Sequence, residues 1–202
     1  MKEKETKKQL LTTAQKHFAL YNYGTVSLKN IASEAGIAKS TLFHYFDSKD
    51  ALYMAVIDNI FQELKEFLRN EKFFSATRSR DRVLSFFRSF LVWLDDNPDR
   101  AKIMIRVQLD NLEQSKKLSK RYWSPILRFI DLNVKELSDK AAKNSRLFIL
   151  EILNSMIHFV FSLDSHLTLF NRNRNEVLRI YESHVLQTVE HMLFSKESTL
   201  AT

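Results

Sequence analysis

The chain has 202 residues, and its 31 basic and 24 acidic side chains give a formal net charge of +7. Two glycines and two prolines are too few turn residues for an all-β fold, and two glycines cannot form a glycine-rich phosphate loop. The absence of cysteine excludes disulfides and thiolate zinc sites. The basic excess favours a polyanionic partner such as nucleic acid or an anionic membrane surface.

The charge and hydropathy pattern does not predict a membrane protein. The first residues mix Lys and Glu and lack the apolar run of a signal peptide. The longest uncharged apolar run, 152–163, has 12 residues, whereas about 20 are needed to span a bilayer. We therefore expect a soluble, cytoplasmic protein.

The N-terminal quarter predicts a series of helices with readable ends. Helical spacing of apolar residues over 7–21 is followed by Asn22, which we expect to adopt the left-handed conformation that ends a helix. Ser27 is the expected N-cap of a short helix over 28–35 that ends at Gly36.

Two further helices follow in the same segment. The first is predicted over 39–45, and Ser48 is the expected N-cap of the second. One apolar stripe on that second helix consists of Leu52, Val56, Ile60 and Leu64.

The rest of the sequence predicts longer helices. Phe86, Phe90 and Trp93 share one helix face, and Asn97-Pro98 and Ser124-Pro125 each have the pattern of a helix start. The segment 147–163 is apolar nearly all round, so we expect it to be buried on more than one side. After a polar break at 171–175, a final amphipathic helix is predicted over 177–192.

Two short helices meet across a glycine in the run SLKNIASEAGIAKSTLFHYF, residues 27–46. A helix-turn-helix needs a small residue in its first helix, a left-handed residue in its turn and an apolar plug in its second helix. Ala32, Gly36 and Leu42 have the right spacing for these three roles. The pattern favours DNA binding, with an ordinary corner between two helices as the alternative.

The longer run NYGTVSLKNIASEAGIAKSTLFHYFDSKDAL resembles the DNA-binding domain of TetR-type (TetR/AcrR-like) transcriptional regulators. The resemblance covers about the first quarter of the chain, without gaps. It implies an all-α, homodimeric protein with an N-terminal three-helix DNA-binding domain. A connecting helix would join this domain to a larger C-terminal helical domain for ligand binding and dimerisation.

The run departs from the family pattern at four positions. Asn22 and Ser40 stand where the family usually has glycine. Ala38 replaces the serine that caps the second helix, a change that costs about 0.5–2 kcal/mol of helix stability. Phe43 replaces a tyrosine, so one hydroxyl is lost.

The helix over 39–45 carries the candidate DNA contacts. If Leu42 and Phe46 point into the domain, the remaining polar side chains face outward, where they can meet a major groove. The resemblance implies base contacts by Lys39, Ser40, Thr41 and His44, and phosphate contacts by Ser27, Tyr45 and Lys49. The lysines at positions 2, 4, 7 and 8 either touch flanking phosphates or belong to a solvated terminus.

A candidate ligand site is harder to define. The apolar residues that could line a pocket are Phe86, Phe90, Trp93, Met156 and Phe159, although such stripes are more often simply core. Arg106 could orient an acidic ligand head group or pair with Asp110, and Glu151 could bind a ligand cation or form an ion pair across a dimer. The resemblance implies a small-molecule effector without identifying it.

Catalysis and metal binding have no supporting pattern. The histidine pairs 184/191 and 158/166 lack the i, i+4 spacing of a helical zinc site, and no nucleophile or carboxylate pair can be assigned. We expect no enzyme activity, no cofactor and no metal.

These expectations combine into one interpretation. Residues 1–50 would form the DNA-binding domain and 51–202 the ligand-binding and dimerisation domain, with the dimer built on 147–163 and 177–192. The protein would be a repressor released from a palindromic double-stranded operator by a small, apolar ligand. The alternative is a helical ligand- or partner-binding module without DNA-binding activity.

Overall fold

In a computed structural model of the protein, the described residues are 2–69, 78–110, 112–134 and 139–194. Their regular structure is entirely helical, and they contain no β-strand. The elements are α1 (Lys2–Leu20), the short 3-10 helix η1 (Tyr23–Thr25), α2 (Leu28–Glu34), α3 (Lys39–Tyr45), α4 (Lys49–Leu68), α5 (Ser79–Asp95), α6 (Asp99–Asp110), α7 (Leu112–Val134), α8 (Asp139–Phe161), α9 (Leu163–Phe170) and α10 (Arg174–Phe194).

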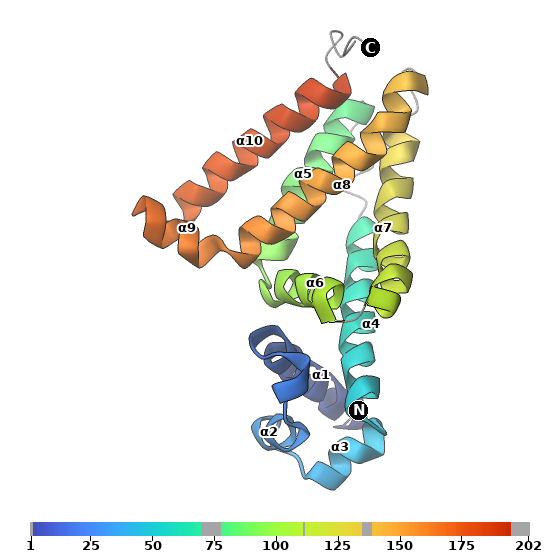
Figure 1. The fold of residues 1–202 in the computed structure, drawn as a ribbon, viewed down its shortest axis with the longest axis vertical. Helices are drawn as coiled ribbons and strands as arrows, with labels where there is room; N and C mark the ends of the chain where they lie inside the picture. The colour runs from blue at the N-terminus through green and yellow to red at the C-terminus, as the bar shows by residue number, and fades with distance from the viewer. Residues whose placement is uncertain (1, 70–77, 111, 135–138, 195–202) are drawn as a thin grey trace.

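The helices are divided between the two ends of an elongated molecule (Figure 1). Helices α1, α2 and α3 gather at one end, and α4 runs from this end into the group formed by α5, α7, α8 and α10. Helix α6 lies between the two groups and packs on α1 as well as on α7 and α8. The all-α class, with an N-terminal helix-turn-helix domain and a helical C-terminal domain, is confirmed. The boundary at residue 50 stays a prediction.

Local hydrogen bonds explain why the chain turns between α2 and α3. Gly36 has a φ of +66°, and its N–H bonds with the Ser33 carbonyl at 3.1 Å while the Ile37 N–H bonds with the Ala32 carbonyl at 3.0 Å. This pair of bonds is a Schellman motif, which satisfies carbonyl groups at a helix end and needs a left-handed residue. The turn predicted at Gly36 is therefore present.

The predicted serine caps are also present. The Ser27 hydroxyl accepts a bond from the Asn30 N–H at 3.4 Å, and the Ser48 hydroxyl accepts one from the Ala51 N–H at 3.0 Å. By contrast, Ala38 begins α3 without any side-chain cap. Helix α3 therefore depends on tertiary contacts for its position.

Those contacts come from a small core shared by α1 to α4. Ile31, Ala32, Leu42 and Phe46 are 0%, 2%, 0% and 6% exposed, and Phe18 of α1 packs in the same cluster. The core predicted for the helix-turn-helix is confirmed. The predicted first helix begins earlier than expected, at Lys2.

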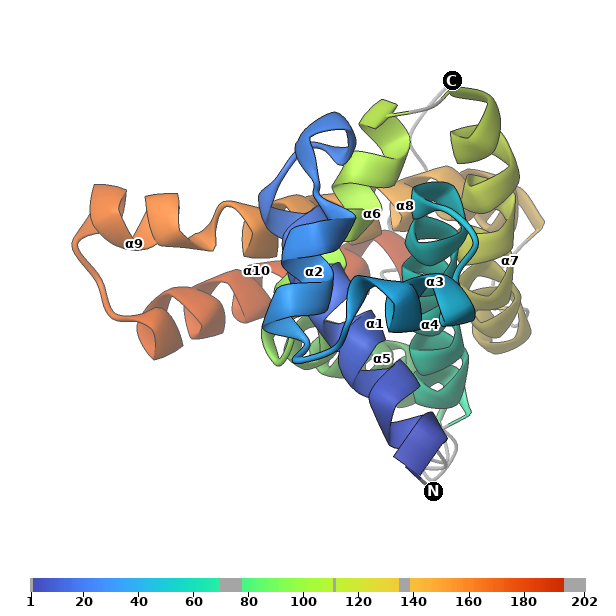
Figure 2. The same ribbon diagram turned by 90° about the horizontal axis from the view of Figure 1, so that it is seen from below.

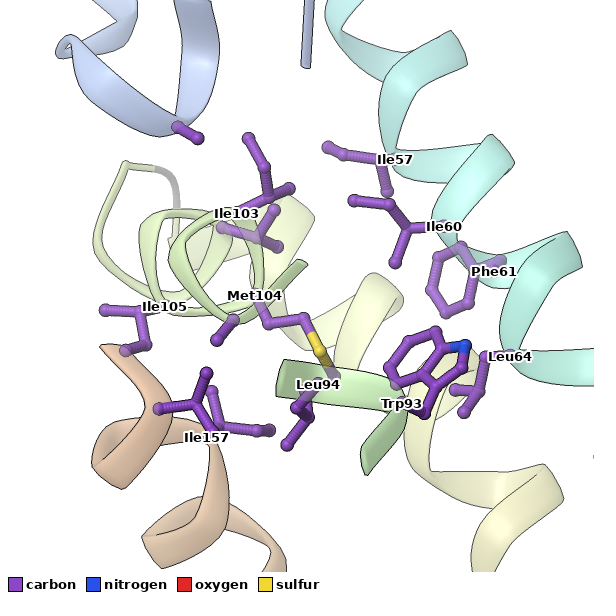
Figure 3. Packing of buried hydrophobic residues seen from close by; sticks show 14 of the residues in the cluster. Ile57, Ile60, Phe61, Leu64, Trp93, Leu94, Ile103, Met104, Ile105 and Ile157 are labelled. Carbon is purple, nitrogen blue, oxygen red and sulfur yellow. The ribbon is translucent and has the colours of Figure 1, made fainter. Parts of the chain in front are cut away.

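The core continues into the C-terminal helices without interruption. Figure 3 shows Phe61 and Leu64 of α4 beside Trp93 of α5, with Met104 of α6 and Ile157 of α8 nearby. Helix α4 contributes buried residues to both ends of the core. It is therefore the connecting helix that the family resemblance implied.

Two local predictions are wrong. Asn22 is extended, with φ −61° and ψ 144°, because it precedes η1 and binds Arg106 rather than ending α1 in a left-handed turn. Pro125 lies inside α7 and does not start a helix. The Ser124 hydroxyl, expected to cap a helix start, instead donates to the Lys120 carbonyl one turn earlier at 2.5 Å.

The apolar segment 147–163 is not one helix. Helix α8 ends at Phe161, and α9 follows at an angle of 68° to it. In both views α9 lies at the tip of the hairpin formed with α10 (Figures 1 and 2). No single described helix is long and apolar enough to cross a membrane; only the bent pair α8–α9 would pass, on length and composition alone.

Gly36→Ala should lower the free energy of unfolding by about 1 kcal/mol, because only the left-handed backbone, and no neighbouring atom, opposes a Cβ there. Gly24→Ala is the matched control: its Cβ would also meet nothing, but its backbone is not left-handed, so stability should stay the same or rise slightly. Urea unfolding followed by circular dichroism measures both. Equal midpoints for Gly36→Ala and the wild type would contradict the proposed role of the turn.

Candidate nucleic-acid interface

Helix α3 lies at one end of the molecule (Figure 1), and one side of it is exposed. Leu42 is fully buried, whereas Lys39, Ser40, Phe43 and His44 are exposed. These four positions follow the helical repeat, so they form one stripe, which we call the α3 stripe. The predicted contacts Thr41 and Tyr45 lie beside it and are half-buried.

Phe43 is the member of the stripe that sequence reasoning did not include. Its side chain is 41% exposed, and the Lys39 ammonium lies 5.6 Å from its ring centroid. The available signal was the spacing, because position 43 is four residues after Lys39 and therefore shares its side of the helix.

The start of α1 lies against the end of α3. The Tyr45 hydroxyl donates to the Glu3 carbonyl at 3.4 Å, and the Lys7 ammonium is 5.7 Å from the centroid of the Phe46 ring. Lys7 therefore lies beside the predicted contacts of α3. Lys4 and Lys8 are exposed on the same helix, whereas the Lys2 side chain is outside the described residues.

Lys49, at the N-terminus of α4, is held by η1, the short helix between α1 and α2. Its ammonium donates to the Gly24 carbonyl at 3.2 Å and lies 4.6 Å from the centroid of the Tyr23 ring. Both Lys49 and the other predicted phosphate contact, Ser27, are half-buried at the start of a helix, where backbone N–H groups favour an anion.

Tyr23 of η1 is also connected to α4, through Asp50. The Tyr23 hydroxyl donates to the Asp50 carboxylate, and burial together with this bond raises the pKa of Tyr23 to about 12. The phenol is a donor at neutral pH even at its ordinary pKa, and the raised pKa extends this range to more alkaline solution. The ring under Lys49 is therefore fixed in place.

The candidate ligand residues are mostly core. Phe86, Phe90 and Met156 are fully buried, and Trp93 is 8% exposed. The rings of Phe86 and Phe90 are stacked, as are those of Phe90 and Trp93.

Phe159 makes a different ring contact. Its ring stacks on Tyr181 of α10 with the centroids 3.6 Å apart, and the Tyr181 hydroxyl lies 3.0 Å from that of Ser155. This stack joins α8 to α10. It does not extend the Phe86–Phe90–Trp93 series.

Arg106 has a role that the sequence did not predict. Its guanidinium donates to the Ala19 carbonyl at 3.2 Å, to the Leu20 carbonyl at 3.4 Å and to Asn22 Oδ1 at 2.9 Å. These acceptors are at or just after the C-terminus of α1, where helix carbonyl groups lack partners and favour a cation. The Asp110 side chain, its expected ion-pair partner, lies outside the described residues.

Comparison with known proteins agrees with this geometry. The sequence profile described as "Bacterial regulatory proteins, tetR family" matches residues 10–56, the segment that contains α2, α3 and most of α1. This match assigns residues 10–56 to the tetR family.

Similarity to curated tetR-family relatives covers only part of each protein. The HTH-type transcriptional regulator RutR of Escherichia coli K12 is 41% identical over 54 residues, which are 27% of this chain and 26% of RutR. The HTH-type transcriptional activator FasR of Mycolicibacterium smegmatis is 30% identical over 104 residues, 50% of this chain and 45% of FasR. The chain thus spans between a quarter and half of the length of these relatives.

Similarity of fold extends along nearly the whole chain. The crystal structure of the transcriptional regulator FadR from Bacillus subtilis in complex with stearoyl-CoA has a TM-score of 0.70 to this structure. The match covers 92% of this chain and 97% of that one, at 16% sequence identity. At that identity, the likeness shows a shared fold and nothing more.

Arg106→Ala should lower the free energy of unfolding by about 1–2 kcal/mol, because carbonyl groups at the end of α1 lose a charged donor. Hydrogen exchange should also increase at the Tyr21 amide, which closes the last turn of α1 on the His17 carbonyl. Arg88→Ala is the matched control, because Arg88 pairs with Glu182 on the surface and should contribute less than about 1 kcal/mol. Unchanged exchange at Tyr21 would show that Arg106 does not hold this helix end.

Proposed function

We propose that the protein is a sequence-specific DNA-binding transcriptional regulator. The observation that carries the proposal is the α3 stripe, which is exposed at the end of the molecule and has Lys49 nearby at a helix N-terminus. A short helix with basic and hydroxyl side chains on its free face can enter a major groove while helix N-termini beside it bind the phosphates.

The proposed roles separate base contacts from phosphate contacts. Lys39, Ser40, Thr41 and His44 would meet base edges, whereas Ser27, Tyr45 and Lys49 would bind phosphates. In this proposal residues 1–50 bind DNA and residues 51–202 bind a ligand and dimerise. The protein would act in the cytoplasm of a bacterium, because its target is the chromosome, and without catalysing a reaction.

Lys49→Ala and His44→Ala should affect DNA binding in different ways. Loss of Lys49 should weaken binding to every sequence and reduce the slope of log K against log salt by about one per half-site. Loss of His44 should cost about 1–3 kcal/mol per half-site on the selected operator and change non-specific binding little. Titrations of operator and random duplexes at several salt concentrations measure both effects.

Lys120→Ala, at an exposed position of α7, is the control and should leave the salt slope unchanged. If His44→Ala weakens operator and random DNA equally, then His44 is not a base reader. If neither Lys49→Ala nor His44→Ala changes binding to the selected operator, the proposed interface is wrong.

A dimer built on α8 and α10 is the second part of the proposal. Leu147 and Phe161 of α8 and Ile180 of α10 are 65%, 48% and 52% exposed, which leaves apolar surface on both helices outside the chain's own core. Glu151 is exposed on α8 as well and could form an ion pair across this interface. A two-fold dimer would present two copies of α3 to a palindromic operator, with half-sites about 34–36 Å apart or at a multiple of this spacing.

Ile180→Glu should convert the dimer into a monomer at micromolar concentration, because it places an unpaired carboxylate in the interface. Val92→Glu is the matched control: Val92 is 53% exposed on α5, so the dimer should persist. Sedimentation velocity measures both. A dimeric Ile180→Glu protein, or a monomeric wild type, would contradict this choice of helices.

Regulation by a small apolar ligand completes the proposal. The region that supports it is the aromatic core of Phe86, Phe90 and Trp93, whose Trp93 ring lies under Arg100 of α6. Because Arg106 joins α6 to α1, a ligand that displaces α6 would also move α1 and, with it, the two α3 helices of the dimer. We propose that such a ligand binds one arrangement better and thereby releases the operator, as expected for a repressor.

A further inference from the structure

Phe43 is an apolar residue on a surface that is otherwise built for polar contacts. Its neighbours in the α3 stripe are Lys39, Ser40 and His44, all exposed. We propose that the Phe43 ring reads a thymine in each operator half-site by contact with the 5-methyl group of that base. This inference rests on the proposed function and names one base that the interface recognises.

Phe43 is not part of the protein's buried core. Leu42 and Phe46 supply the buried contacts of α3, at 0% and 6% exposure, whereas Phe43 is 41% exposed. The ammonium of Lys39, from the same helix, lies over the Phe43 ring, 5.6 Å from its centroid. The ring is therefore available to a groove that α3 enters.

The chemistry of the major groove restricts what such a ring can contact. Base edges there carry carbonyl oxygens, ring nitrogens and amino groups, and thymine is the one base that adds a methyl group. A phenyl ring against an amino group or a carbonyl oxygen would remove water without supplying a hydrogen bond, which is unfavourable. Phe43 should therefore favour thymine and disfavour cytosine, which has an amino group and no methyl at this edge.

The absence of a hydroxyl strengthens this assignment. A tyrosine at position 43 could donate to a phosphate or a base acceptor, but phenylalanine has no donor or acceptor. Its contribution to DNA binding is then limited to apolar contact. Such a contact changes neither the number of neutralised phosphates nor the salt dependence of binding.

The test replaces thymine by deoxyuridine, which removes only the methyl group. The full chain first selects its operator from random duplex DNA, and each thymine is then replaced at symmetric positions in both half-sites. We expect one symmetric pair at which the replacement weakens wild-type binding by about fourfold per half-site, the effect of one buried methyl group. The other replacements should have smaller effects.

Variants of the chain assign the effect to Phe43. Phe43→Ala should weaken binding to the thymine operator, keep the salt slope of the wild type and bind thymine and deoxyuridine operators equally well. Phe43→Leu should retain part of the discrimination. Lys39→Ala should bind more weakly but still distinguish the two operators. Circular dichroism and thermal melting, unchanged for Phe43→Ala, verify that the variant is folded.

Each outcome decides between the two proposals. If the chain selects DNA but no position is sensitive to methyl removal, or if Phe43→Ala keeps the full sensitivity, the thymine contact is wrong and the proposed function stands. A steeper or shallower salt slope for Phe43→Ala would also overturn it, because the residue would then affect phosphate contacts. If the chain selects no DNA at all, both proposals fail.

Discussion

Helix α3 has only seven residues, and a helix of this length is not stable by itself in water. Every contact that the protein can make with a groove therefore depends on what holds α3 from outside. The Schellman turn at Gly36 sets its direction, and Leu42 and Phe46 anchor it in the core. Helix α2 packs against it, and the start of α1 contacts its end through Tyr45. Because Ala38 provides no side-chain cap, the position of α3 depends on these contacts.

The same dependence connects the DNA-facing end to the rest of the molecule. Helix α1 packs against α4 and α6, and Arg106 binds its C-terminal carbonyl groups. A second arginine, Arg100, donates to Glu63 of α4 at 2.8 Å and lies over the Trp93 ring. Helix α6 thus contacts both helices that enter the N-terminal domain, so a displacement of α6 cannot occur without a change at α1 or α4.

The arrangement of the C-terminal helices depends on the apolar surface that they bury against one another rather than on helix caps. Aromatic residues of α5 stack on one another and make tilted ring contacts with Phe67 of α4. Few glycines or prolines interrupt the helices. The chain's own core leaves part of α8 and α10 uncovered. Helix α9 extends their hairpin beyond the rest of the molecule (Figure 2), which adds exposed apolar residues such as Leu169 and Phe170.

The sequence by itself determined what depends on neighbours a few residues apart. Gly36, Ser27 and Ser48 act through bonds that span three to five residues, and Leu42 is buried because of its place in a short repeat, so the helix-turn-helix was predictable. Asn22 and Arg106 bind each other although they are 84 residues apart in the chain. No local sequence pattern specifies such a contact. The bend after Phe161, the position of Pro125 inside α7 and the exposure of Phe43 were likewise decided by the tertiary structure, because each depends on which helices pack nearby and which side of a helix they leave free.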